Sequence, residues 1–263
     1  MKFETIIYQI NRGVGVLTLN RPATLNSFTS LMHEEVKVAI NDAKINSSVR
    51  CLVITGAGRG FCAGQDLGDR AVKVAAEGPD LGDSIERNYN PLIRNLMAME
   101  KPVICAVNGV AAGAGASIAL ACDIVLAARS AKFVQAFCKI GLVPDSGGTF
   151  NLPRALGLPR AKGLALLGDK LSAEQAEKWG MIWQCVDDEA LMKETLEIAE
   201  HLATQPTKGL AMIKKLLNES FSNPLHQQLE IEKDAMQSLG KSDDYREGVS
   251  AFMEKRQPYF TGQ

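Results

Sequence analysis

The sequence predicts an α/β fold in which a core of strands and helices is followed by a region made only of helices. Up to about residue 150, short runs rich in β-branched residues alternate with helical stretches. Beyond that point the strand signal almost disappears, and the last helical stretches are separated by Pro206, Pro224 and Gly240. We therefore expect residues 1–204 to form the core with the active site, and residues 205–263 to form a helical region that packs subunits together.

Short apolar runs bounded by turn residues are expected to be the strands of the core. They are GVLTLN at 15–20, CLVIT at 51–55, VICAV at 103–107 and DIVLA at 123–127. One further short strand is expected within 181–186, after the alternation has ended.

Helices are predicted from apolar periodicity and from capping residues. Residues 28–44 repeat apolar side chains on one helical face, and residues 113–122 are small or aliphatic, as in a tightly packed helix. Ser172 followed by Gln175 is typical of a capping box, here for a helix that ends near Trp179. The last helices are expected at 188–204, 206–221, 224–239 and 243–256.

Charge and hydropathy give no indication of a nucleic-acid or membrane partner. The net charge is −1, and no basic run is longer than Lys214-Lys215, so the basic stripe of a nucleic-acid binder is missing. The longest apolar stretch, 102–122, is interrupted by Asn108 and by glycines, so we expect no membrane span. The first residues show neither a signal-peptide nor a transit-peptide pattern, and we expect a cytoplasmic protein.

Cysteine and histidine positions do not indicate a metal site. Six cysteines, at 51, 62, 105, 122, 138 and 185, have no C-x-x-C spacing and lie mostly among apolar or small residues. This pattern predicts buried, reduced thiols. The histidines at 33, 201 and 226 each fall in an amphipathic helical pattern and are expected at the surface or in packing contacts. We expect no metal.

Motifs for nucleotide cofactors and for common hydrolases are missing from the sequence. It contains no G-x-G-x-x-G fingerprint, no Walker A motif and no H-E-x-x-H. Ser117 stands in a near match to the nucleophile elbow G-x-S-x-G but lacks the second glycine. No separate cofactor is therefore expected.

Three glycine-rich loops carry the candidate chemistry: GAGRGFCAGQD at 56–66, NGVAAGAGAS at 108–117 and GLVPDSGGT at 141–149. The second loop leads from a strand into a helix, so it exposes unpaired backbone N–H groups that suit an anion or a transient oxyanion. A tight packing contact between strand and helix would explain the same glycines. The third loop sets Asp145 between Pro144 and two glycines, and the loop alone leaves a helix N-cap and an acid/base role open.

Four motifs together resemble the crotonase superfamily, also called the enoyl-CoA hydratase/isomerase superfamily. They are N-R-P-x-x-L-N-S-F at 20–28, G-x-G-x-x-F-C-A-G-Q-D at 56–66, P-V-I-C-A-V-N-G-x-A-x-G-x-G at 102–115 and G-L-V-P-D-S-G-G-T at 141–149. The resemblance extends over the whole chain. It implies a core of repeated ββα turns in a spiral, followed by helices that build homotrimers, often paired into hexamers.

The resemblance also implies a site for a coenzyme A thioester, in which coenzyme A is part of the substrate. The thioester oxygen would be bound by the backbone N–H groups of Gln65 and Ala114. Asp145 stands where isomerases of the superfamily place a single carboxylate, which takes a proton from one carbon and returns it to another. A dry pocket would raise the pKa of this carboxylate toward the operating pH. This context favours the acid/base role over the cap, and the two are compatible.

Further positions are assigned to substrate binding by the same resemblance. In this chain they are Ala23, Leu25, Ala63, Asp66, Leu67, Val110, Gly113, Phe133, Phe137 and Pro144. Phe252 and Lys255 match positions that contribute from a neighbouring subunit. Residues 67–91 are expected to form a lid over the acyl end.

One departure from the superfamily argues against hydration. Hydratases carry two glutamates that hold and activate water, and the matching positions here are Ser117 and Phe137. Neither side chain serves as a base, and Phe137 would help to exclude water.

Stretches at 59–70, 79–92, 171–184 and 244–252 resemble one subfamily in particular, the isomerases of bacterial phenylacetate degradation. The resemblance implies conversion of ring-1,2-epoxyphenylacetyl-CoA to the oxepin thioester, some 3,2-enoyl-CoA isomerase activity, and contact with other enzymes of that pathway. Three alternatives stay open: a general 3,2-enoyl-CoA isomerase of fatty-acid β-oxidation, a dehalogenase-like attack by Asp145 on an aryl carbon, and a non-enzymatic trimeric scaffold or RNA-binding relative.

Overall fold

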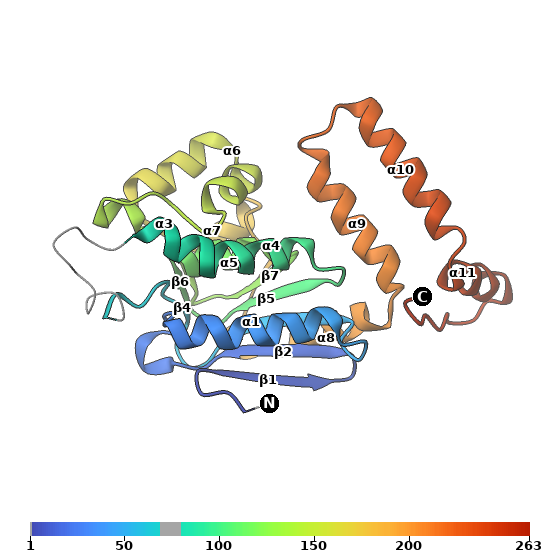
Figure 1. Ribbon diagram of the computed structural model, residues 1–263, viewed down its shortest axis with the longest axis horizontal. Helices are drawn as coiled ribbons and strands as arrows, with labels where there is room; N and C mark the ends of the chain where they lie inside the picture. The colour runs from blue at the N-terminus through green and yellow to red at the C-terminus, as the bar shows by residue number, and fades with distance from the viewer. Residues whose placement is uncertain (1, 69–79) are drawn as a thin grey trace.

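Two β-sheets form the centre of the computed structural model, which describes residues 2–68 and 80–263 (Figure 1). The larger sheet has the strand order β1-β2-β3-β5-β7-β10, and the smaller has the order β4-β6-β8-β9. The strands are β1 (Ile6–Asn11), β2 (Val14–Leu19), β3 (Cys51–Gly56), β4 (Gly60–Cys62), β5 (Val103–Val107), β6 (Val110–Ala112), β7 (Ile124–Ala128), β8 (Lys132–Val134), β9 (Lys170–Ser172) and β10 (Gln184–Val186).

Successive turns of the chain add one strand to each sheet. β3, β5 and β7 are parallel neighbours in the larger sheet, while β4, β6 and β8 are parallel neighbours in the smaller one. The pairs β3–β4, β5–β6 and β7–β8 are therefore the repeating ββ units of a spiral. The α/β class and the ββα spiral that were expected from the sequence are confirmed.

Helices close the two faces of this core. α1 (Ser30–Ile45) contacts α4 (Asn90–Ala98), and α8 (Leu191–Thr204) packs against β3, β5 and β7. Because the strands of the larger sheet are covered on both faces, β3 and β5 read as continuous apolar runs rather than as alternating ones. The remaining core elements are η1 (Pro22–Thr24), α3 (Leu81–Ser84), the π-helical turn η2 (Ile85–Tyr89), α5 (Ala114–Leu120), η3 (Ala136–Ile140), α6 (Gly148–Leu167), α7 (Ala173–Lys178) and η4 (Asp188–Ala190).

The last three helices extend to one side of the core (Figure 1). They are α9 (Thr207–Ser220), α10 (Leu225–Leu239) and α11 (Asp243–Glu254), and α9 packs against α10. The predicted boundary between residues 204 and 205 falls between α8 and α9. Large apolar side chains stay exposed along this hairpin, among them Leu217, Phe221 and Leu225.

The predicted elements agree with the observed ones apart from several boundaries and omissions. The strand expected within 181–186 is shorter, because only Gln184–Val186 pairs with β7. The helix expected from residue 28 begins at Ser30, where the Thr29 side chain accepts a hydrogen bond from the amide of Met32. The capping box at Ser172 is confirmed, since its hydroxyl accepts the N–H of Gln175 at 3.2 Å. The sequence reasoning did not identify β1, the short strands of the smaller sheet, or α4.

Two further predictions, the lid and the absence of a membrane span, can be compared with the described residues only. Of the proposed lid at 67–91, residues 69–79 lie outside the described residues. Within the described ranges, no helix combines the length and the hydropathy needed to cross a membrane.

Candidate active site

The first glycine loop is held in place by the side chain of Asn26. This side chain is fully buried, and its Nδ2 donates to the carbonyl oxygens of Gly60 at 2.8 Å, Ala57 at 3.0 Å and Phe61 at 3.1 Å. Its Oδ1 accepts the N–H of Arg21 at 2.8 Å. Asn26 has φ +56°, a left-handed conformation that asparagine adopts more readily than most residues. The N-R-P-x-x-L-N motif thus positions the loop that carries Gln65.

The first two glycine loops touch backbone to backbone. A Cβ atom built on Gly115 would lie 2.2 Å from the carbonyl oxygen of Cys62, so only glycine fits. Asn108 adds a polar link, since its Oδ1 accepts the N–H of Gly56 at 3.1 Å. The strand–helix packing contact that the sequence left open as an explanation for these glycines is therefore present, and it brings the two loops together.

The orientation of the Gln65 N–H group follows from the hydrogen bonds of its neighbours. The carbonyl of Gly64 accepts the N–H of Phe28 at 2.8 Å, and Phe28 in turn accepts the N–H of Asp66 at 2.9 Å. In a trans peptide the C=O of one residue and the N–H of the next point in opposite directions. The N–H of Gln65 therefore points away from Phe28.

The N–H group of Ala114 is oriented in a similar way by the start of α5. The carbonyl of Gly113 accepts from the amides of Ala116 at 3.1 Å and Ser117 at 3.2 Å, so it points into the helix. The N–H of Ala114, in the same trans peptide, points out of the helix start. A Cβ atom on Gly64 would lie 3.3 Å from this nitrogen. The peptide groups that carry the two predicted oxyanion donors are thus neighbours.

The positions at which hydratases carry glutamates hold an aromatic ring and a buried hydroxyl here. The ring of Phe137 is buried and lies 3.7 Å from the position that a Cβ atom on Gly113 would take. Ser117 is fully buried, and its hydroxyl lies 3.5 Å from the carbonyl oxygen of Gly113 one turn earlier in α5. Neither of these two positions therefore supplies a carboxylate.

Asp145 lies half-buried in the loop that precedes α6. The hydroxyl of Ser146 donates to its Oδ1 at 2.9 Å. The N-cap residue of α6 is Gly147. The acid/base role of Asp145 stays a prediction.

The start of α6 packs directly on α5. A Cβ atom on Gly148 would lie 2.7 Å from the hydroxyl oxygen of Ser117 and 3.1 Å from Cβ of Pro144. Ser117 is three residues from Ala114 and therefore shares its helix face. This contact brings the Pro144–Asp145 loop to the end of α5 at which Ala114 presents its N–H.

The predicted coenzyme A positions gather around the first loop. The N–H of Ala63 donates to the carbonyl of Leu25 at 2.9 Å, and Ala23 lies on the neighbouring turn η1. Leu67 is 59% exposed, which leaves its side chain available for contact. Asp66 instead forms an ion pair with Arg21 at 2.9 Å, so its carboxylate holds the loop.

Four predicted substrate positions lie elsewhere in the fold. Val110 opens β6, while Phe133, on β8, is buried and faces a small cavity behind α5 with Ala116. Phe252 and Lys255 are exposed on α11 and just beyond it, on the side of the molecule away from β4 and β6 (Figure 1). Their contribution from a neighbouring subunit stays a prediction.

The side chain of Gln65 has a role that the sequence did not indicate. Its Oε1 accepts the hydroxyl of Tyr89 at 3.0 Å and lies 3.4 Å from Nε2 of His33. The prediction that His33 is a surface or packing residue is confirmed as regards packing, because its ring is buried against Phe28 and Tyr89. Tyr89 lies in the stretch at 79–92 that resembles one subfamily, but that resemblance does not pair it with Gln65, so only the fold reveals this contact.

The cysteines are free thiols, and four of them are buried. Burial raises the pKa of the thiols of Cys51 and Cys62 to about 12, so neither is a thiolate at neutral pH. Among the described residues, no group of three or more histidine, cysteine, aspartate or glutamate side chains is arranged to hold a metal ion.

Comparisons with known proteins agree with this geometry. The model of the family described as enoyl-CoA hydratase/isomerase matches residues 9–263. The 1,2-epoxyphenylacetyl-CoA isomerase of Escherichia coli is 58% identical over 260 residues, which cover 99% of each chain. The trans-2-decenoyl-(acyl-carrier-protein) isomerase of Streptococcus mutans is 36% identical over 263 residues, or 100% of each chain.

A solved structure shares the fold over its full length. The enoyl-CoA hydratase from Bacillus anthracis superimposes with a TM-score of 0.91 at 30% identity, covering 99% of this chain and 100% of that one. Sequence, sheet topology and loop geometry thus lead to the same assignment. The chain belongs to the enoyl-CoA hydratase/isomerase family of the crotonase superfamily.

Proposed function

We propose that this enzyme isomerises ring-1,2-epoxyphenylacetyl-CoA to the oxepin thioester in phenylacetate catabolism, and that it also shifts the double bond of 3-enoyl-CoA thioesters to the 2,3 position. The observation that carries this proposal is the 58% identity, over 99% of both chains, with the Escherichia coli 1,2-epoxyphenylacetyl-CoA isomerase. The geometry of the site supports it independently, because it combines two oriented N–H groups with a single carboxylate.

The thioester oxygen binds between the N–H groups of Gln65 and Ala114. Neighbouring hydrogen bonds fix both peptide groups, so these donors need no reorientation when negative charge develops on the oxygen. Preorganised donors of this kind stabilise an enolate, and loss of one typically costs about 10²–10³ in kcat. Coenzyme A lies along Ala23, Leu25, Ala63 and Leu67, and the enzyme needs no other cofactor.

Asp145 carries the proton. In the double-bond shift its carboxylate removes a proton from C2 of the thioester and returns it to C4, so one group serves as base and then as acid. In the epoxide reaction the same carboxylate assists opening and rearrangement of the ring. Support comes from its loop, since Gly148 at the start of α6 packs against Pro144 of that loop and against Ser117 of α5, one helical turn from Ala114.

Hydration is not part of this proposal. The Phe137 ring lies against Gly113, where it shields the acyl end from water, and position 117 holds a buried hydroxyl in place of a carboxylate. Binding and activation of water require polar groups that these two positions do not offer.

A homotrimer, or two trimers paired into a hexamer, is the assembly that we infer for the enzyme. Exposed apolar side chains line the α9–α10 hairpin, and apolar surface of this extent favours burial against another subunit. They are Ile213, Leu217, Phe221, Leu225, Leu229 and Met236. In such an assembly Phe252 and Lys255 would reach a neighbour's coenzyme A. Six free thiols fit a reducing cytoplasm.

A general 3,2-enoyl-CoA isomerase of fatty-acid oxidation is the second candidate, because the same carboxylate and N–H groups suffice for it. Turnover of three thioesters by the wild-type enzyme separates the candidates: ring-1,2-epoxyphenylacetyl-CoA, a trans-3-enoyl-CoA and a trans-2-enoyl-CoA. We expect the highest kcat/KM for the epoxide, measurable isomerisation of the 3-enoyl thioester and negligible hydration. Efficient 3-enoyl turnover without epoxide turnover would favour the second candidate, and rapid hydration would contradict both.

A further inference from the structure

The side chain of Gln65 is held at both ends of its amide. Nε2 donates to the carbonyl of Phe28 at 2.9 Å, and Oε1 accepts the hydroxyl of Tyr89 at 3.0 Å. Nε2 of His33 lies 3.4 Å from the same Oε1. We call these four residues, Phe28, His33, Gln65 and Tyr89, the amide clamp. It joins the first glycine loop to α1 and to η2.

Donor and acceptor chemistry assigns each role in the amide clamp. A backbone carbonyl only accepts, so the NH₂ group of Gln65 must face Phe28 and its oxygen must face Tyr89 and His33. A carbonyl oxygen has two lone pairs, so it accepts both the Tyr89 hydroxyl and an N–H at Nε2 of His33. His33 therefore carries a hydrogen on Nε2 in this arrangement.

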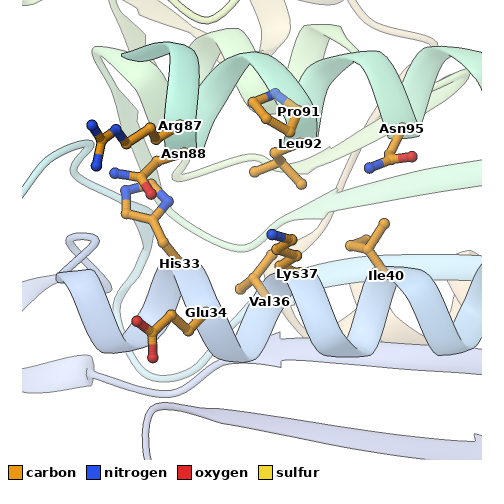
Figure 2. Close-up of a pocket in the computed structure, with 10 residues that line it drawn as sticks. All are labelled: His33, Glu34, Val36, Lys37, Ile40, Arg87, Asn88, Pro91, Leu92 and Asn95. Atoms are coloured by element: carbon orange, nitrogen blue, oxygen red, sulfur yellow. The ribbon is translucent and has the colours of Figure 1, made fainter. Parts of the chain in front are cut away.

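Packing leaves the amide clamp little freedom. Tyr89 is fully buried, and its ring meets that of His33 edge to face, with centroids 4.5 Å apart. The Phe28 ring packs against His33 with centroids 4.7 Å apart and ring planes tilted by 40°. Figure 2 shows the groove between α1 and α4, with His33 rising from α1 toward Arg87 and Asn88 of η2. The hydroxyl of Tyr89 is thus held at one point relative to Gln65.

The peptide that the amide clamp surrounds is the one that carries the oxyanion donor. Phe28 uses its N–H to hold the carbonyl of Gly64, and its own carbonyl accepts both the N–H of Asp66 and the side chain of Gln65. The residue whose N–H faces the thioester is therefore fixed on both sides by its backbone and from a third direction by its side chain. An error of about 1 Å in the position of such a group can cost about 100-fold in rate.

We propose that Tyr89, acting through the side chain of Gln65, is a positioning residue for the oxyanion hole, with His33 in support. This inference rests on the proposed function, since it assumes that the N–H of Gln65 binds the thioester oxygen. It adds a requirement for the Gln65 side chain, which a backbone donor does not need by itself. Tyr89 ends η2, so the hydroxyl also ties the donor to the segment that leads into α4.

Removal of the Tyr89 hydroxyl tests the proposal. In Tyr89→Phe the ring and its packing remain, and we expect kcat for a 3-enoyl-CoA to fall by about 5-fold to 100-fold while KM changes less than about twofold. The matched control is Tyr8→Phe, which removes a hydroxyl bonded to Asp42 at 3.0 Å on the β1–α1 side of the core. The control loses a hydrogen bond of similar length, so it should lower the melting temperature and leave kcat unchanged.

A double-mutant cycle separates positioning from a general loss of stability. Gln65→Met keeps the backbone N–H and removes all three side-chain hydrogen bonds, so we expect a similar loss of kcat. In the Gln65→Met background, Tyr89→Phe should then change kcat by less than about twofold, because the hydroxyl has no amide to act on. If Tyr89→Phe does not fold, Gln65→Met alone still tests the requirement for the side chain.

The outcomes distinguish this inference from the function on which it rests. Unchanged kcat in Tyr89→Phe or in Gln65→Met, with an active wild type, would overturn the positioning role and leave the proposed function standing. Additive losses in the double variant would also overturn it, since they would show that Tyr89 does not act through Gln65. A wild type that turns over none of the thioesters would overturn the proposed function and the inference with it.

Discussion

Gly115 lies so close to Cys62 that a Cβ atom on the glycine would come within 2.2 Å of the cysteine's carbonyl oxygen. This contact joins the two loops that carry the proposed oxyanion donors, and backbone atoms cannot move aside as a flexible side chain can. We predict that Gly115→Ala lowers the free energy of unfolding by about 1–3 kcal/mol through overpacking. It should also reduce kcat by at least about tenfold, because it separates Gln65 from Ala114. Chemical denaturation and steady-state kinetics measure the two effects.

Gly163→Ala is the matched control for this prediction. Gly163 lies in α6, and a Cβ atom there would meet nothing within 4 Å. Alanine is a better helix former than glycine by about 1 kcal/mol, so this variant should be as stable as the wild type or more stable, with unchanged kcat. Equal behaviour of the two glycine variants would contradict the close approach at Gly115.

Glu35 makes the anchoring of the N-terminal segment sensitive to acid. Its carboxylate accepts the N–H groups of Glu4 at 2.7 Å and Thr5 at 2.8 Å and the hydroxyl of Thr5. Desolvation acts to raise the pKa of Glu35, but these hydrogen bonds together outweigh it, so the pKa lies below its ordinary value of 4.5. A lowered pKa stabilises the fold above about pH 4.5, and this contribution is lost as the pH falls through the folded-state pKa.

We predict that Glu35→Gln lowers the free energy of unfolding by about 2 kcal/mol at pH 7, because one anchored N–H loses its acceptor. The difference from wild type should shrink as the pH falls below about 4.5. Glu34→Gln, at the exposed neighbouring position, should change the stability by less than about 0.5 kcal/mol at any pH. A difference between Glu35→Gln and wild type that stays constant down to pH 3 would contradict this account.

Thiol labelling of the native enzyme tests the packing around the cysteines. Cys51, Cys62, Cys105 and Cys122 are buried, and burial raises the pKa of the first three. We expect a disulfide reagent at pH 8 to modify no more than the two half-buried cysteines, Cys138 and Cys185, until denaturant is added. Rapid modification of more than two thiols in the folded enzyme would show that the core is more open than described.

Much of the fold could be predicted from the sequence because local patterns and tertiary packing agree there. CLVIT and VICAV consist almost entirely of apolar residues, and they form the buried strands β3 and β5 with both faces covered. The Ser172 capping box depends only on residues three apart, so it was visible directly. β1 was missed because its burial is partial and its sequence mixes polar with apolar residues; it is an edge strand whose pairing with β2 is a tertiary contact.

In the candidate site, too, some residues could be predicted from local sequence patterns and others only from the structure. Gln65, Ala114 and Asp145 were named because glycine-rich loops and an isolated carboxylate leave a signal in the sequence. The role of the Gln65 side chain could not be predicted, since its partner Tyr89 comes 24 residues later and no local pattern links the two positions. Asp66 was assigned to substrate binding, and only the structure shows its ion pair with Arg21. The hydrogen-bond and ion-pair partners of these side chains depend on how the loops pack in three dimensions, which no local sequence pattern shows.

The most direct test of the central claim is turnover of ring-1,2-epoxyphenylacetyl-CoA and a 3-enoyl-CoA by Asp145→Asn. Asparagine keeps the size of the side chain and can still accept from Ser146, but it cannot carry the proton. We predict that kcat falls by about 10²–10⁴ for both thioesters while the circular dichroism spectrum and melting temperature stay close to those of the wild type. Near-normal turnover by the folded variant would contradict the assignment of Asp145 as the acid/base.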